Sequence, residues 1–255
     1  MTHPEDSFTL PINYNYYLTG LIYDVVSTSS TDYATFLHDE GYTDGETAKK
    51  FKLFTFSQLR FRQMRVEGDR IRSTSPRMDL YISSPVREFV EHLADGLLGK
   101  ERFPIGREES FRAEEIEVLE PPEFNEEMKF ICLSPLVAST VVEEEGELKT
   151  YYYRYSDDEL SKAVASNLAQ KYRLVHGEGI EPGRFRLQFD PDYVKRRNGR
   201  ISKLVRYKNT KIKGIFAPFS VRGKPELIKV GYQAGFGEKG SMGFGMVAGA
   251  ENSAD

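Results

Sequence analysis

A pair of prolines near the middle of the chain limits the fold more than any other feature. Pro121 and Pro122 lack backbone amide hydrogens and have a fixed φ, so neither a helix nor a central strand continues through them. The polar stretch Glu123–Glu127 that follows is typical of a linker. Each side of the break has roughly the length of an ordinary domain, about 100 to 150 residues. The sequence therefore predicts two domains, 1–120 and 127–255.

The first half contains alternating strand and helix patterns. Apolar residues at helical spacing predict a helix over Tyr14–Ser27, and Pro85 opens a second helix that carries Phe89 and Leu93. A short helix over Asp32–His38, with Thr31 as its cap, is predicted between them. Alternating apolar residues predict strands at 8–12, 51–61, 64–66, 71–72, 78–82 and 111–119.

The second half repeats this pattern. After an acidic turn at Glu143–Glu147, Ser156 and Glu159 form a predicted capping box that opens a helix. Gly223–Leu227 predicts no more than a turn, and the chain ends in a glycine-rich segment. Strands are predicted at 128–133, 184–189, 201–207 and 212–221.

The order strand–helix–strand–strand–helix–strand, found twice, predicts an α+β protein with tandem ferredoxin-like domains. Two features depart from that pattern. Only seven residues, mostly polar, precede Phe8, so the opening strand of the first unit is expected to be short, absent or lost to a misassigned start of the chain. The second unit shows no clear helix before its last strand.

Charge and composition exclude several classes of protein. The net charge of −4 argues against binding nucleic acid through overall charge. Cys132 is the only cysteine, so neither a disulfide framework nor a thiolate zinc site is expected. The start, Met1–Asp6, lacks a signal-peptide pattern, and no apolar stretch approaches the roughly 20 residues that span a bilayer. These features predict a cytoplasmic protein with no membrane association.

Positive charge is nevertheless concentrated locally. One stretch without acidic residues is expected to form a phosphate-binding surface, and a second basic group lies at 60–72. Charge runs also occur on solvated surfaces without a ligand, so that alternative stays open. The residues of the first stretch predicted to contact phosphates, as of a nucleic acid, are Lys195, Arg196, Arg197, Arg200, Lys203 and Arg206.

The segment Gly231–Val247 is the most unusual part of the chain. Glycine-rich backbone can approach a ligand closely, and its amides can hold phosphate oxygens. Phe236 or Phe244 could stack on a base. The segment lacks the lysine–serine pair of a nucleotide-binding loop. A glycine-containing hairpin with a purely structural role is the alternative.

This segment resembles the C-terminal glycine-rich loop of CRISPR-associated repeat-processing endoribonucleases, members of the RAMP superfamily. Upstream stretches match that family in order and approximate spacing. They are Tyr16-Tyr17-Leu18-Thr19-Gly20-Leu21-Ile22-Tyr23, Ala34-Thr35-Phe36-Leu37-His38, Lys52-Leu53-Phe54-Thr55-Phe56-Ser57 and Phe130-Ile131-Cys132-Leu133-Ser134.

The resemblance implies an endoribonuclease that cuts the repeats of precursor CRISPR RNA without a metal or other cofactor. The implied products carry a 2',3'-cyclic phosphate and a 5'-hydroxyl. The implied catalytic residues are Tyr23, His38 and Lys52. Two protein partners stay open, subunits of a CRISPR effector complex and a second copy of the chain. The loop residues expected beside RNA are Gly235, Gly237, Lys239, Gly243 and Gly245.

The implied trio suits RNA cleavage, in which the 2'-hydroxyl attacks the adjacent phosphate. Histidine can move protons at neutral pH, tyrosine can position or help deprotonate the 2'-hydroxyl, and lysine can stabilise phosphate charge. Each residue also has an ordinary role: His38 could cap helix carbonyls, Tyr23 could pack in the core, and Lys52 could be a solvated strand residue.

Two other functions compete with this one. The first is a non-catalytic RNA-binding RAMP subunit of a CRISPR effector complex, and the intact trio argues against it. The second is a regulated structural module, because a ferredoxin-like fold does not fix function. A metal site is disfavoured, since the consecutive ligands of His38-Asp39-Glu40 rarely converge on one ion.

Overall fold

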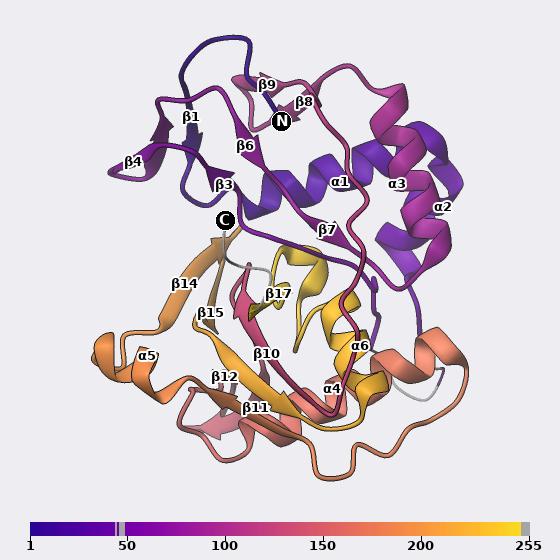
Figure 1. Cartoon of the computed structure of the whole chain (residues 1–255), viewed down its shortest axis with the longest axis vertical. Coiled ribbons are helices and arrows are strands. Elements are labelled where there is room, and N and C mark those ends of the chain that lie inside the picture. Colours follow the sequence, from indigo (N-terminus) through magenta and orange to yellow (C-terminus); the bar gives the residue numbers. More distant parts are fainter. Residues whose placement is uncertain (44, 46–48, 251–255) are drawn as a thin grey trace.

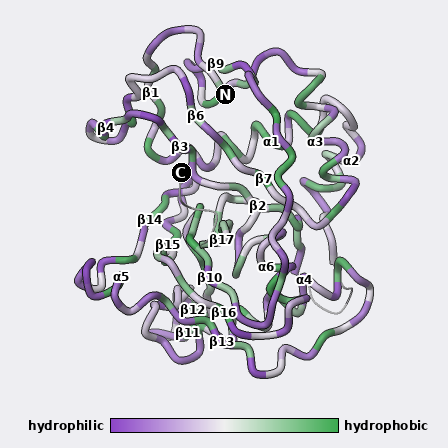
Figure 2. The backbone as a smooth tube through the Cα atoms, in the orientation of Figure 1, coloured by the Kyte–Doolittle hydropathy of each residue, from purple (hydrophilic) through white to green (hydrophobic). Residues whose placement is uncertain are grey.

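The computed structural model describes residues 1–43, 45 and 49–250, which form two lobes (Figure 1). Each lobe has its own hydrophobic core. The core of the first lobe is built from residues between Phe8 and Phe111, and that of the second from residues between Phe130 and Val247. Stretches of hydrophobic residues occur along the chain in both lobes (Figure 2).

The second lobe has the complete ferredoxin-like topology. Its antiparallel sheet has the order β13-β16-β10-β17, so the first and third strands of the unit lie in the centre. The elements of the unit are β10 (Glu127–Cys132), α4 (Leu160–His176), β13 (Arg186–Phe189), β16 (Phe219–Arg222), α6 (Pro225–Ala234) and β17 (Val247–Gly249).

The prediction that Gly223–Leu227 forms only a turn is wrong, because α6 begins at Pro225. A proline in the first turn of a helix loses no hydrogen bond and already has a helical φ. Leu227 and Ile228 then bury their side chains in the second core. The second helix that the sequence pattern had not revealed is therefore present.

Additional elements extend the second lobe beyond this unit. The predicted acidic turn is the tip of a hairpin whose strands were not predicted. The additional elements are β11 (Ser139–Glu144), β12 (Glu147–Tyr152), α5 (Pro191–Arg196), β14 (Ser202–Tyr207) and β15 (Thr210–Ile215).

The predicted capping box before α4 is also wrong. Helix α4 begins at Leu160 without a side-chain cap, and Asp157 accepts hydrogen bonds from the Arg154 amide and the Tyr151 hydroxyl.

The first lobe is less regular. Its sheet is divided into short antiparallel pairs, β2 with β7, β3 with β6 and β8 with β9, beside the sheet β1-β5-β4. The elements are β1 (Phe8–Pro11), α1 (Asn15–Ser29), α2 (Thr31–Thr35), the π-helix η1 (Phe36–Glu40), β2 (Thr55–Phe56), β3 (Arg60–Phe61), β4 (Met64–Glu67), β5 (Arg70–Ser73), β6 (Met78–Asp79), β7 (Ile82–Ser83), α3 (Arg87–Gly99), β8 (Phe103–Ile105) and β9 (Glu109–Phe111).

Thr2 occupies the position of the opening strand of the first unit. Thr2 forms antiparallel bridges to both Arg77 and Arg112, so it lies where the central strand of a ferredoxin-like sheet belongs. The Thr2 and Arg112 amides each donate to the other's carbonyl oxygen at 2.9 Å. The Phe8–Pro11 strand pairs instead with β5, in a different sheet.

Three other local predictions for the first half need correction. The strand predicted at 111–119 ends at Phe111, and Val118 is 87% exposed because its segment pairs with no other strand among the described residues. The strand predicted at 51–61 is interrupted, since Leu53 has φ 52°. The short helix is capped by Ser30, whose hydroxyl accepts from the Tyr33 amide, and not by Thr31.

Helices α1 and α3 cross at a glycine. A Cβ atom on Gly96 would lie 1.9 Å from the carbonyl oxygen of Val25, whereas one on Gly99 would lie 3.6 Å from the nearest Thr28 atom. In the described part of the chain, no helix is long and apolar enough to cross a membrane.

The crossing of α1 and α3 predicts opposite effects for the same substitution on one helix. Gly96→Ala should lower the free energy of unfolding by about 2 kcal/mol or more, because two backbones must separate. Gly99→Ala should leave it unchanged or raise it by up to about 1 kcal/mol. Urea unfolding of both variants tests this, and equal stabilities would contradict the close crossing.

Candidate active site

The structure brings Tyr23, His38 and Lys52 together on the first lobe. The rings of Tyr23 and His38 meet edge to face with centroids 5.4 Å apart, and the Tyr23 ring also contacts Phe54. Lys52 Nζ donates to the backbone carbonyl of His38 at 2.7 Å. Three residues spread over 30 positions of sequence are thus neighbours.

His38 owes its position to the π-helix η1. A π turn holds one more residue than an α turn, and the Gly41 amide closes it by donating to the Phe36 carbonyl. Lys50 and Lys52 both donate to carbonyl oxygens at the end of this turn. The side chain of His38 remains 70% exposed and is therefore accessible to a ligand.

Asp39 orients the imidazole of His38. Its Oδ1 lies 2.6 Å from His38 Nδ1, and a carboxylate can only accept in that contact, so Nδ1 carries the hydrogen. Nε2 is then left to take up or release a proton. The sequence reading considered Asp39 only as a metal ligand. The adjacency of an acid to the histidine was the available signal for this orienting role.

Burial changes the acidity of the other two groups. It is the main reason that the pKa of Tyr23 is raised above its usual value, and nearby Tyr207 adds to the effect. The Tyr23 hydroxyl is thus protonated at neutral pH and can donate a hydrogen bond. Burial and the neighbouring Lys50 lower the pKa of Lys52, while Asp39 opposes them.

The glycine-rich segment is packed between the two lobes. A Cβ atom on Gly237 would lie 2.2 Å from the Val137 carbonyl oxygen, and one on Gly240 would lie 2.6 Å from that of Phe54. Thr55 Oγ1 donates to the Phe244 carbonyl oxygen at 2.9 Å. The backbone that these glycines approach closely is the protein's own, so the structural alternative accounts for much of the segment.

The base-stacking prediction for Phe236 and Phe244 is wrong. Both rings are fully buried, Phe236 in the core of the second lobe and Phe244 beside Val137 and Ile212. Lys239, by contrast, is half-buried. It directly precedes the short helix η2 (Gly240–Met242) and has φ 62°. Contact of RNA with Lys239, Gly235, Gly237, Gly243 and Gly245 stays a prediction.

A buried lysine that the sequence reading missed holds the segment in place. Lys171 of α4 is 4% exposed, and its Nζ donates to the carbonyl oxygens of Ala234, Gly235 and Gly237 at 3.0, 2.6 and 2.7 Å. Three acceptors use all three hydrogens of an ammonium group. Burial nevertheless lowers the pKa of Lys171 to about 7. A lysine on the apolar side of the predicted helix was the only signal in the sequence.

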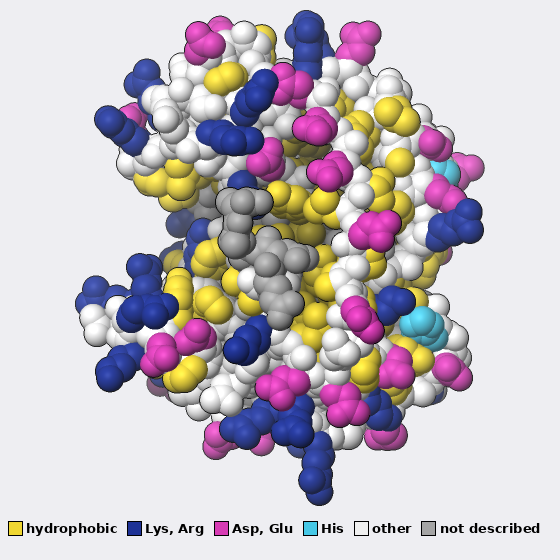
Figure 3. Space-filling view, viewed as in Figure 1, with side chains coloured by type: hydrophobic (Ala, Val, Ile, Leu, Met, Phe, Trp, Pro, Cys, Tyr) yellow, Lys and Arg dark blue, Asp and Glu magenta, His cyan; other side chains and the backbone are white. Residues whose placement is uncertain are grey.

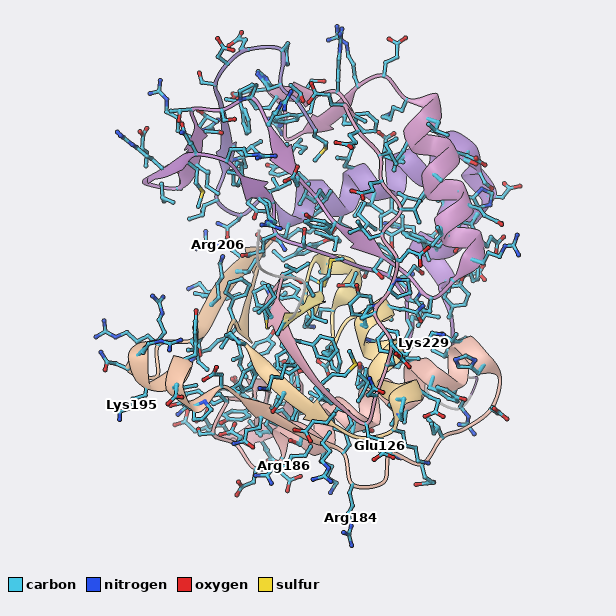
Figure 4. All side chains as sticks on the ribbon, viewed as in Figure 1. Glu126, Arg184, Arg186, Lys195, Arg206 and Lys229 are labelled. Carbon is cyan, nitrogen blue, oxygen red and sulfur yellow. The ribbon has the colours of Figure 1, made fainter. Side chains whose placement is uncertain are left out.

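The basic stretch is divided between two places. Lys195 and Arg196 lie on α5 at the edge of the second lobe, whereas Arg206 lies on β14 beside the first lobe (Figure 4), where its amide donates to Asn13 Oδ1. Lys203 Nζ donates to Gln58 Oε1 at 2.7 Å across the two lobes. The remaining members, Arg197 and Arg200, are exposed after α5.

The second basic group is partly engaged within the protein. Arg70 forms an ion pair with Glu108, and Arg60 lies over the ring of Tyr81. Arg65 and Arg72 are opposite each other on β4 and β5. In Figure 3, Lys and Arg side chains border the notch between the lobes from both sides. No three His, Cys, Asp or Glu side chains of the described residues are grouped as metal ligands.

Solved structures define the class of this protein. A Cas6-related protein from Pyrococcus furiosus has a TM-score of 0.84 and 26% identity, covering 99% of this chain and 96% of that one. A RAMP protein that binds different RNA substrates has a TM-score of 0.80 and 26% identity, covering 97% and 96%. The chain is thus a tandem ferredoxin-like protein of the RAMP class, as the sequence predicted.

Sequence comparison defines the family. The model of CRISPR-associated protein Cas6, N-terminal, matches residues 9–117, and that of CRISPR associated protein Cas6, C-terminal, matches residues 119–248. The CRISPR-associated endoribonuclease Cas6 1 of Methanocaldococcus jannaschii is 34% identical over 253 residues, which is 97% of this chain and 90% of the relative. The chain belongs to the Cas6 family.

Lys171 predicts a pH-dependent stability. Its pKa of about 7 in the folded protein lies below the usual 10.5, so the unfolded chain binds more protons between these values. Stability due to this group should therefore rise with pH across that window, by roughly 1 kcal/mol per pH unit.

Urea unfolding of the wild type and Lys171→Met at several pH values measures this effect as a growing difference between them. Lys162→Met, an exposed change on the same helix, should show no such trend. A constant difference for Lys171→Met would mean that the three carbonyls keep the ammonium charged.

Proposed function

We propose that this chain is a metal-independent endoribonuclease that cuts the repeats of precursor CRISPR RNA to give guide RNAs. The observation that supports this most is the contact among Tyr23, His38 and Lys52 on an exposed surface. Relatives covering nearly the whole chain carry the name of CRISPR-associated endoribonuclease. The Cas6 fold supplies the two domains, for which 1–120 and 127–255 remain our proposed boundaries.

In the proposed reaction, the 2'-hydroxyl of the nucleotide before the cut attacks the adjacent phosphorus, and the bond to the following 5'-oxygen breaks. The products are a 2',3'-cyclic phosphate and a 5'-hydroxyl. One proton leaves the 2'-oxygen and one reaches the departing 5'-oxygen, so the overall step needs no added water.

The geometry suggests a role for each residue. His38 Nε2, left free by the hydrogen bond from Nδ1 to Asp39, exchanges a proton with a reacting oxygen. Tyr23 is protonated at neutral pH, and its raised pKa further disfavours loss of that proton, so it positions the 2'-hydroxyl or a phosphate oxygen by donating to it. Lys52 provides positive charge to the phosphate as negative charge develops.

RNA phosphates are proposed to contact the exposed basic residues of the second lobe, with the glycine-rich segment alongside the strand. Lys195, Arg196, Arg197, Arg200 and Arg206 are exposed and available. Lys203 bridges the lobes and would contact RNA at their junction. Effector-complex subunits and a second copy of the chain are further partners that we keep as proposals.

Cleavage of a labelled CRISPR repeat RNA in EDTA tests this function. Wild-type protein should cut, and His38→Ala should lower the rate by roughly 100-fold or more, since one positioned acid or base contributes that much. His176→Ala serves as the matched control, because His176 is exposed on α4 and its ring packs at a tilt against Tyr172.

A 2'-deoxy nucleotide at the cut site should abolish cleavage by every variant. Cleavage of the deoxy substrate, or an unchanged rate for His38→Ala, would contradict the mechanism. Tight binding without cleavage by the wild type would favour the non-catalytic RNA-binding subunit.

The orienting role of Asp39 makes a separate prediction. Asp39→Asn can still contact His38 Nδ1 through its amide oxygen, but without the charge that stabilises the protonated imidazole. We expect a fall in single-turnover cleavage rate of roughly tenfold, smaller than for His38→Ala, because the pair is solvent-exposed. Binding of uncleavable RNA should not change. An equal loss in both variants would indicate that Asp39 itself transfers the proton.

A further inference from the structure

Gly20 has no structural reason to be glycine. It lies in the interior of α1, where glycine destabilises a helix relative to alanine. Its side is exposed, and a Cβ atom there would meet nothing within 4 Å. Gly96 of α3 differs in this respect, since its glycine permits the crossing with α1. An open position on a helix, free of a side chain, leaves room for a molecule from outside.

The neighbours of Gly20 on α1 are aromatic. Tyr16 lies four residues before it and Tyr23 three residues after it, which places all three on one side of the helix. Tyr16 is 42% exposed. The rise of an α-helix puts Tyr16 about 10 Å along the axis from Tyr23. Gly20, where the helix backbone is open, therefore lies between Tyr23, the proposed catalytic tyrosine, and the exposed ring of Tyr16.

The second lobe completes this surface. Tyr207, at the end of β14, meets the Tyr16 ring edge to face at 5.6 Å and is close enough to Tyr23 to raise its pKa. Lys208 Nζ lies 4.7 Å from the centre of the Tyr16 ring. On another side, Thr19 Oγ1 donates to the carbonyl of Ser241 in the glycine-rich segment. Both lobes therefore fix the position of Tyr16 and its surroundings.

We infer that Gly20 and Tyr16 form a nucleotide subsite next to the cut. The sugar–phosphate backbone passes against the bare helix surface at Gly20, and the adjacent base stacks on the exposed face of Tyr16. Lys208, exposed in the turn after β14, contacts the phosphate of the same nucleotide. Stacking on a tyrosine ring accepts any base, so this subsite positions the strand and does not read its sequence.

This inference rests on the proposed function, because it takes RNA as the ligand. The two are separable by experiment, since the subsite affects binding and the trio affects cleavage. The RNA used is therefore a repeat with a 2'-deoxy nucleotide at the cut site, whose dissociation constant is measured at one fixed salt concentration.

Gly20→Ala gives the sharpest test. It should raise the melting temperature by roughly 2 °C, because alanine favours the helix. It should at the same time weaken RNA binding several-fold, and the longer Gly20→Gln should weaken it further. Gly99→Ala is the matched control on α3 and should leave RNA binding unchanged. A side chain at position 20 that leaves affinity unchanged would overturn the inference.

Tyr16 variants test the stacking part. Tyr16→Leu should weaken binding by roughly tenfold, whereas Tyr16→Phe, which keeps the ring, should bind like the wild type. Equal affinities for Leu and Phe would also overturn the subsite. If the wild type binds no repeat RNA, the proposed function fails, and this subsite fails with it. If the Gly20 and Tyr16 variants bind and cut repeat RNA as the wild type does, only the subsite fails.

Discussion

The relative position of the two lobes depends on the close packing of the glycine-rich segment between them. A Cβ atom on Gly237 would lie 2.2 Å from the Val137 carbonyl oxygen of the second lobe, and one on Gly240 would lie 2.6 Å from the Phe54 carbonyl oxygen of the first, so only glycine fits. Asn15 and Thr19 of α1 donate to carbonyls of the same segment from the first lobe, and Lys171 donates to others from the second. The position of α1, and therefore of Tyr23, relative to the second lobe follows from these contacts.

The same packing connects the glycine-rich segment to the candidate active site. The segment runs beside Phe54 and Thr55, which follow Lys52 by two and three residues. The other end of the site is fixed by η1, whose extra residue per turn directs His38 toward Tyr23. A loop from one lobe and a helix irregularity in the other thus hold three side chains whose proposed chemistry needs fixed positions.

Sequence reasoning succeeded where periodicity is strong and failed where tertiary contacts decide. The alternation of Met128–Leu133 and the apolar spacing of α1 identified the main elements. Helix α6 was missed because its last turn, from Gly231, was assigned to the glycine-rich segment, although Gly231 is needed where the Phe236 ring packs. The alternation at 111–119 misled because exposed linker residues can alternate without any partner strand.

The candidate site was only partly predictable, for similar reasons. The positions of Tyr23, His38 and Lys52 came from family resemblance, and no periodicity could show that they are in contact. The burial of Phe236 and Phe244 could not be inferred from a glycine-rich composition typical of exposed loops. Lys171 and the orienting contact of Asp39 depend on side-chain directions that only the folded chain defines.

In the proposed reaction, the RNA's own 2'-oxygen is the nucleophile. Mass spectrometry of both new ends after brief cleavage of a repeat RNA identifies the attacking atom. We expect a 3' end with the mass of a cyclic phosphate, one water lighter than a linear phosphate, together with a 5'-hydroxyl end. A 3'-hydroxyl paired with a 5'-phosphate would require attack by water and would contradict the proposed reaction.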